Sequence, residues 1–113
     1  MHELSIVMGI VDIAATAVKK ANASTVEVIE LEIGELSGIE TDALLFAWDA
    51  AVKNTVLAQA QRDIRFIPGR ARCSDCGEVF DMRQLYDPCP QCGNFLNEII
   101  QGRELKVKAL TVS

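Results

Sequence analysis

The sequence predicts an α+β fold, with a small mixed three-stranded sheet, two helices and a metal-binding lobe inserted between strands. Apolar residues recur at helical spacing in two segments and alternate with polar residues in three others. The four cysteines stand in two C-x-x-C pairs between the second and third predicted strands. With 113 residues, the chain suits one core carrying a small lobe that depends on its metal. We therefore expect one α/β domain, residues 1–69 with 104–113, and a zinc-ribbon domain, residues 70–103.

The predicted helices cover residues 4–20 and 41–54. In the first, apolar residues recur every three to four positions, as one face of a helix requires: Leu4, Val7, Met8, Val11, Ala14, Ala15 and Val18. Two lysines at its end suit the negative end of the helix dipole. In the second, Thr41 or Asp42 can cap the first turn, and Trp48 is in phase with the other apolar residues. We expect Trp48 to lie in the core.

Three further segments have the alternation of strands. Residues 26–33 oppose β-branched residues to acidic ones, so one face of this strand should be buried and the other acidic. A second strand runs from about Ile64 to the Pro68-Gly69 pair, which marks the boundary of the lobe. A third strand, residues 105–109, alternates apolar residues with lysines and returns the chain to the first sheet.

The net charge of −5 is concentrated in the first half of the chain. Residues 1–60 hold nine acids against three bases, whereas residues 61–113 hold seven against eight. Nucleic-acid binders need a basic surface for phosphate contacts, so this balance argues against a nucleic-acid partner. No apolar run approaches the roughly 18 residues that span a bilayer, and no signal peptide is evident. We expect no membrane partner and a cytoplasmic location, where thiols stay reduced.

The cysteines Cys73, Cys76, Cys89 and Cys92 have the spacing of a tetrathiolate zinc site. Each pair turns two thiolates toward one ion, and a glycine after each pair is free to take the positive φ that such a turn needs. Four thiolates leave no vacancy for a substrate, so we interpret the zinc as structural. The same cysteines would also suit a zinc-ribbon module for nucleic-acid or protein interaction, or a rubredoxin-like iron carrier.

The single histidine, His2, limits the available chemistry. It excludes catalytic triads built on a histidine base in a pocket, and the sequence has no phosphate-binding or dinucleotide-binding glycine loop, so we expect no enzyme activity. At the second position, the α-amine, the His2 backbone nitrogen and the imidazole can close adjacent chelate rings around Ni(II) or Cu(II). The alternative is an inert histidine on a frayed terminus.

Three segments share their motifs with a known protein family. They are Met1-His2-Glu3-Leu4-Ser5, Ile33-Gly34-Glu35-Leu36-Ser37-Gly38-Ile39-Glu40, and the cysteine pairs with Pro90 and Gly93. Together they resemble the HypA/HybF family of hydrogenase maturation nickel metallochaperones. The resemblance implies a nickel-binding domain of mixed sheet and helices joined to a zinc-ribbon lobe. It also implies delivery of Ni(II) during assembly of [NiFe]-hydrogenase, beside a structural Zn(II).

By position, the resemblance assigns the nickel ligands to the amino terminus. Met1 would supply its amine, His2 its backbone nitrogen and imidazole, and Glu3 a backbone or side-chain contact. Glu40 is a further candidate, because some relatives use an aspartate there as an oxygen ligand, where this chain has the longer glutamate. Both glutamates have a second interpretation, as acids that favour the positive end of a helix. The implied partners are the hydrogenase large subunit, the nickel-handling GTPase HypB and urease maturation proteins.

Overall fold

The computed structural model describes residues 2–113 and confirms the expected α+β class. In chain order the elements are α1 (His2–Lys20), β1 (Val26–Gly34), α2 (Thr41–Ala51), β2 (Gln61–Ile67), β3 (Arg70–Cys73), β4 (Val79–Asp81), β5 (Asn97–Gln101) and β6 (Leu105–Val112). The two predicted helices and three predicted strands are α1, α2, β1, β2 and β6. Helix α2 ends before residue 54, because Asn54 has a φ of +62°, which a right-handed helix does not contain. Neither helix is long and apolar enough to cross a membrane in the described part of the chain.

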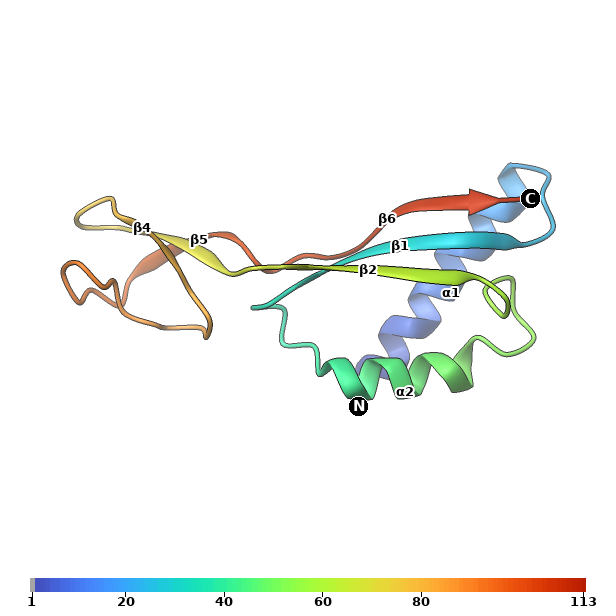
Figure 1. The fold of residues 1–113 in the computed structure, drawn as a ribbon, viewed down its shortest axis with the longest axis horizontal. Helices are drawn as coiled ribbons and strands as arrows, with labels where there is room; N and C mark the ends of the chain where they lie inside the picture. The colour runs from blue at the N-terminus through green and yellow to red at the C-terminus, as the bar shows by residue number, and fades with distance from the viewer. Residues whose placement is uncertain (1) are drawn as a thin grey trace. The chain divides into compact units, whose positions relative to one another are not determined.

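The first sheet has the strand order β2-β1-β6, with β1 in the centre (Figure 1). At the start of β1, Val26 N donates to Val56 O at 3.1 Å, just ahead of β2. Beyond the end of β1, Glu35 N donates to Ile67 O at 2.8 Å, so β1 and β2 run parallel, with α2 in the connection. Strand β6 ends beside the start of β1 and is antiparallel to it. The sheet is therefore mixed, as predicted.

A second sheet, with the order β4-β3-β5, lies in the inserted cysteine lobe and was not predicted. Both pairings are antiparallel, and Ala71 of β3 is opposite Phe80 of β4 and Ile99 of β5. Ala71 and Phe80 are buried, and Ile99 packs against the same cluster. These strands are only four, three and five residues long. Alternation over so few residues does not stand out in a sequence.

The chain forms two compact units, each assembled from separate segments. The first comprises Met1–Leu31, Ile39–Ile64 and Val107–Ser113, and the second comprises Glu32–Gly38 and Arg65–Lys106. The loop after β1 thus belongs to the unit that holds the cysteines. Its Leu36 packs in a buried cluster with Ala71, Cys73, Phe80, Met82 and Cys89. The expected division into domains, with boundaries after residues 69 and 103, stays a prediction.

The core of the first unit draws on both helices and on β1. Helix α1 packs against α2 and buries one stripe of side chains: Glu3, Val7, Ile10, Ala14 and Val18. Trp48 is 4% exposed, which confirms its place in the core, and the Arg62 guanidinium lies 5.4 Å from the centre of its ring. Three large apolar residues of α1 lie outside the buried stripe: Leu4 is 44% exposed, Met8 is 57% exposed and Ile13 is 53% exposed.

Glycines let backbone segments of the second unit approach closely. A Cβ on Gly34 would overlap the carbonyl oxygen of Gly102. A Cβ on Gly102, which has a φ of +112°, would lie 2.6 Å from the Cα of Gly69. Leu36 N donates to Gly102 O at 2.7 Å in the same region. A side chain at Gly34 or Gly102 would force these backbone segments apart.

Candidate metal centres

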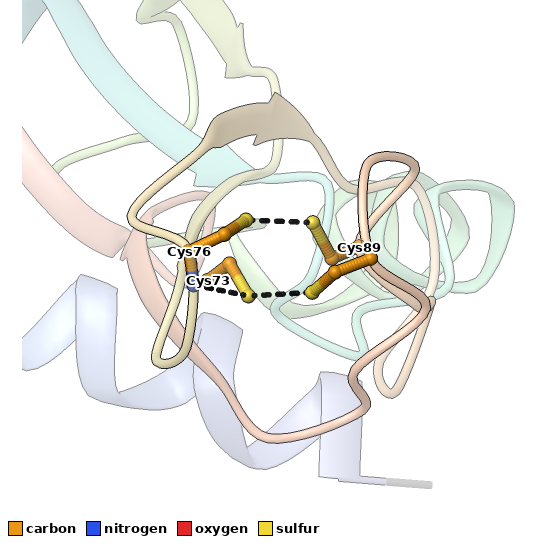
Figure 2. A group of neighbouring side chains, drawn as sticks. Cys73, Cys76 and Cys89 are labelled. Carbon is orange, nitrogen blue, oxygen red and sulfur yellow. Dashed lines mark hydrogen bonds between the residues drawn. The ribbon is translucent and has the colours of Figure 1, made fainter.

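The four cysteine sulfurs converge in the second unit, carried by two C-x-x-C-G turns that we call knuckles. All four sulfurs lie within 4.8 Å of one another. Two contacts join one knuckle to the other, Cys73 to Cys92 at 3.4 Å and Cys76 to Cys89 at 3.6 Å (Figure 2). Zinc–sulfur bonds of about 2.3 Å in a tetrahedron require sulfur separations of about 3.8 Å. The cluster therefore fits a zinc ion.

Each knuckle is closed by the glycine that follows its second cysteine. Gly77 N donates to Cys73 O at 3.1 Å, and Gly93 N donates to Cys89 O at 2.8 Å. The two glycines have φ values of +76° and +78°, which strain any residue with a side chain. The expected positive φ is therefore confirmed in both knuckles, and the two turns are built alike.

Hydrogen-bond donors surround the sulfurs and stabilise negative charge on them. Cys76 N lies 3.5 Å from the Cys73 sulfur, and Gln91 N lies 3.4 Å from the Cys89 sulfur. The side-chain amide of Asn94 adds a longer contact to Cys73 at 3.9 Å. Sequence reasoning missed Asn94, whose only signal is its position directly after a knuckle glycine. Donors of this kind orient metal ligands and tune their charge.

Two cysteines of the cluster have pKa values shifted in opposite directions. The N–H of Cys76, which donates to the Cys73 sulfur, lowers the pKa of Cys73 to about 6. At Cys92 the N–H of Asn94 favours the thiolate, but the neighbouring Cys73 sulfur and burial outweigh it and raise the pKa to about 12. Four adjacent thiolates therefore need a thiophilic divalent cation to neutralise them.

The cysteine cluster has the composition of a structural metal site. Cys73 and Cys89 are each 2% exposed and belong to the hydrophobic core of their unit, while Cys76 and Cys92 are exposed. Within residues 2–113 no other group of three or more His, Cys, Asp or Glu side chains is placed to hold a metal. An ion bound by all four thiolates has no position left for a substrate.

A second group of predicted ligands lies at the start of α1. Met1 falls outside the residues that the structure describes. His2 is the first residue of α1, so its backbone N–H has no carbonyl partner within the helix. Its side chain is 62% exposed, and Nε2 lies 3.7 Å from Glu3 Oε2. His2 thus begins a helix, with its imidazole beside a carboxylate.

Glu3 is a buried acid, 5% exposed, that links the starts of both helices. Its Oε2 accepts the backbone N–H of Glu40 at 3.3 Å. The pKa of Glu3 is lowered to about 2, because the ammonium group at the chain's start and the Glu40 N–H both stabilise the carboxylate. The carboxylate also complements the positive ends of the two helix dipoles. The interpretation of Glu3 as a helix-start acid therefore agrees with these contacts.

Glu40 occupies the N-cap position of α2, with φ of −81° and ψ of 108°. Its side chain is exposed and makes no capping hydrogen bond, so its carboxylate is not committed to the helix. The contact between the Glu40 N–H and Glu3 joins residues 37 positions apart in the sequence. The structure thereby brings His2, Glu3 and the Glu40 backbone to the same end of the first unit, but among the described residues the three side chains do not form a group placed to hold a metal.

Comparison with known proteins places the chain in a family. The HypA family model, described as a hydrogenase/urease nickel incorporation metallochaperone, matches residues 1–112. The hydrogenase maturation factor HypA of Parabacteroides distasonis is 45% identical over 99% of this chain and 97% of its own length. The HypA of Geobacter metallireducens is 41% identical over 99% of both chains. The solution structure of the Ni metallochaperone HypA from Helicobacter pylori has a TM-score of 0.70 at 28% identity, covering 99% of this chain and 97% of that one. The chain therefore belongs to the HypA family and is a nickel-incorporation metallochaperone rather than an enzyme.

Proposed function

We propose that this metallochaperone binds Ni(II) as its cargo at the amino terminus and delivers it during the maturation of [NiFe]-hydrogenase. The proposed ligands are the Met1 amine, the His2 backbone nitrogen and imidazole, Glu3, and Glu40. The observation that supports the proposal is the meeting of His2, Glu3 and the Glu40 backbone where α1 begins. His2 is also the chain's single histidine, so no other imidazole competes for the metal.

The start of α1 suits nickel for two chemical reasons. Because the helix makes no use of the His2 N–H, this nitrogen is available to bind a metal after losing its proton. An amine, an amide nitrogen and an imidazole together form the tetragonal nitrogen set that Ni(II) favours, whereas zinc favours tetrahedral thiolates. The buried Glu3 carboxylate adds negative charge beside this set. Glu40 would add an oxygen ligand.

Zinc has a different role in this proposal. Zn(II) held by the four cysteines stabilises the fold around them, because the free energy of metal binding there is folding free energy. We therefore assign nickel transfer to the domain of residues 1–69 with 104–113, and structural support to the zinc-ribbon domain of residues 70–103. A colourless, zinc-loaded sample would exclude the rubredoxin-like alternative.

The proposed partners follow from the family's description as a hydrogenase/urease nickel incorporation factor. We assign the hydrogenase large subunit as the recipient of nickel, the GTPase HypB as its nickel-handling partner, and urease maturation proteins as a second route. The cytoplasm is the proposed location, because its reducing conditions keep four cysteines available for zinc. The alternative of a nucleic-acid module is disfavoured, since 16 acids outnumber 11 bases.

Calorimetric titration of the untagged protein with Ni(II) tests the proposal. We expect His2→Ala to abolish tight nickel binding, because it removes the imidazole from the nitrogen set. One extra residue ahead of Met1 should do the same, because it moves the amine one residue further from that imidazole. Zinc content should not change in either variant. Asp12→Ala removes an exposed acid from the same helix and serves as the control, with nickel binding unchanged. Unaltered nickel affinity in His2→Ala would refute the assignment.

A further inference from the structure

The second unit contains an apolar cavity of about 160 Å³. Met82 and Ile99, which belong to the small core of this unit, form part of its wall. The other lining residues are Leu85, Tyr86, Phe95, Leu96, Asn97 and Arg103. For comparison, a cavity of about 150 Å³ holds a benzene ring. The cavity therefore has room for one aromatic or branched apolar side chain supplied by another molecule.

Four large side chains that line this cavity remain in contact with water. Tyr86 is 78% exposed and Leu96 is 76% exposed, and their neighbours Leu85 and Phe95 are exposed as well. The two pairs come from the loops before and after the second knuckle. Neighbouring exposed apolar residues of this kind mark interaction surfaces.

Tyr86 is held in a strained backbone conformation. Its φ is +69°, which a bulky residue rarely adopts and which glycine takes at lower cost. The turn around it is fixed, because Asp87 Oδ2 accepts the backbone N–H groups of Arg83 and Gln84, each at 3.1 Å. The Asn97 amide also donates to the Asp87 carbonyl at 3.2 Å. Folding alone explains neither the strain nor the exposed ring, and such strain clusters at ligand-binding sites.

The uncommitted charges at this cavity are positive. Arg103 lines it and Arg83 adjoins a lining residue in sequence, and within residues 2–113 neither arginine forms an ion pair. The acids that adjoin the lining residues in sequence all have partners: two pair with other arginines, and two accept backbone N–H groups. In that order they are Asp81 and Glu98, then Asp87 and Glu104. A free guanidinium beside an apolar cavity favours a carboxylate.

We propose that this cavity docks a segment of a partner polypeptide, which inserts one apolar side chain and pairs a nearby Asp or Glu with Arg103. The cavity holds one side chain while four exposed residues surround it, so the occupant is a chain rather than a single small molecule. Burial of the Tyr86 and Phe95 rings would stabilise the complex. The inference does not depend on the nickel site, which we assign to the first unit.

Selection from a library of random peptides tests the cavity, with the full-length, zinc-loaded protein as the target. We expect the enriched peptides to carry an aromatic residue or leucine close to Asp or Glu. Arg103→Glu should shift the preference from acidic to basic residues, because it reverses the charge at the cavity. Arg65→Glu is the matched control, since Arg65 is exposed but does not line the cavity. It should leave the preference unchanged.

Tyr86→Gly separates peptide binding from stability. It removes the ring and the backbone strain together, so the temperature of unfolding should not fall. Binding of the most enriched peptide, measured by fluorescence anisotropy, should weaken by on the order of tenfold. Asn54→Gly is the matched control, because Asn54 has a φ of +62° and lies in the first unit. It should bind the peptide like the unchanged protein.

Three results would overturn the inference. One is a selection that enriches no peptide, and another is an enriched peptide that binds Tyr86→Gly and Arg103→Glu as tightly as the unchanged protein. The third is self-association in sedimentation that Leu96→Ser abolishes, which would assign this surface to a second copy of the chain. Nickel titration of the same variants should be unchanged, so each of these results would leave the proposed function standing.

Discussion

Replacing Leu36 with alanine tests which unit the loop after β1 supports. Leu36 is 6% exposed and packs against Phe80, Met82 and the buried cysteines in the second unit. The substitution deletes about three buried carbon groups at about 0.8 kcal/mol each, and the cavity left behind raises the total to about 3 kcal/mol. We expect the second unit to be destabilised by this amount and the first unit to be unaffected.

Two signals report the two units separately. Zinc retention reports the second unit, and a loss of about 3 kcal/mol corresponds to about a hundredfold weaker retention against a competing chelator. The fluorescence of Trp48, the chain's single tryptophan, reports the first unit, because its ring is buried there. In Leu36→Ala, zinc should be lost at a lower chelator concentration. The urea concentration at which Trp48 fluorescence reports unfolding of the first unit should not change.

Leu57→Ala is the matched control, since Leu57 is 1% exposed and belongs to the first unit. It should move the Trp48 transition and leave zinc retention close to that of the unchanged protein. This reasoning would be refuted if Leu36→Ala retained zinc normally and its Trp48 fluorescence showed unfolding at a lower urea concentration. It would show that the loop supports the first unit, as the predicted boundary after residue 69 assumes.

Removing zinc with a chelator should unfold the second unit and leave the circular dichroism of α1 and α2 largely intact, whereas complete loss of the helical signal would show that the units fold together. Gly34→Ala should destabilise the protein by more than about 2 kcal/mol, because its Cβ meets the Gly102 carbonyl. Gly9→Ala, with open space around the new Cβ in α1, should instead stabilise it by about 0.5–1 kcal/mol, and thermal unfolding compares the two. The pKa of Glu3 is lowered from 4.5 to about 2, so its contribution to stability is complete above pH 4.5 and is lost as the pH falls to about 2. The free energy of unfolding of Glu3→Gln should therefore change less between pH 4.5 and about 2 than that of the unchanged protein. Urea unfolding at several pH values measures it, and an unchanged pH dependence would contradict the lowered pKa.

Periodicity was sufficient to predict the longer elements. Helices α1 and α2 and strands β1, β2 and β6 each have at least seven residues, enough for a helical or alternating pattern to emerge. The cysteine lobe was predicted from ligand spacing alone, because it has a small core and short strands rather than long amphipathic elements. Its three short strands therefore left no readable pattern.

The candidate sites were predictable where their signal is local in sequence. Cysteine spacing is such a signal, and all four sulfurs converge as expected. Long-range contacts give no such signal. Nothing near Leu36 marks it as a neighbour of the buried cysteines, and nothing near Glu3 shows that it accepts the Glu40 N–H. Helical spacing also does not distinguish a buried apolar residue from an exposed one. The exposed positions of Leu4 and Met8 were therefore not foreseen.

The central place of β1 sets the order in which the chain can fold during synthesis. Strand β1 pairs with β2 on one side and with β6 on the other, and the cysteine lobe is translated between β2 and β6. While the lobe is being made, one edge of β1 has unpaired N–H and C=O groups, which are open to wrong pairing with other strands. The first sheet closes only when residues 105–112 have left the ribosome. All four cysteines emerge before then, so a nascent chain can take up zinc before its first sheet is complete.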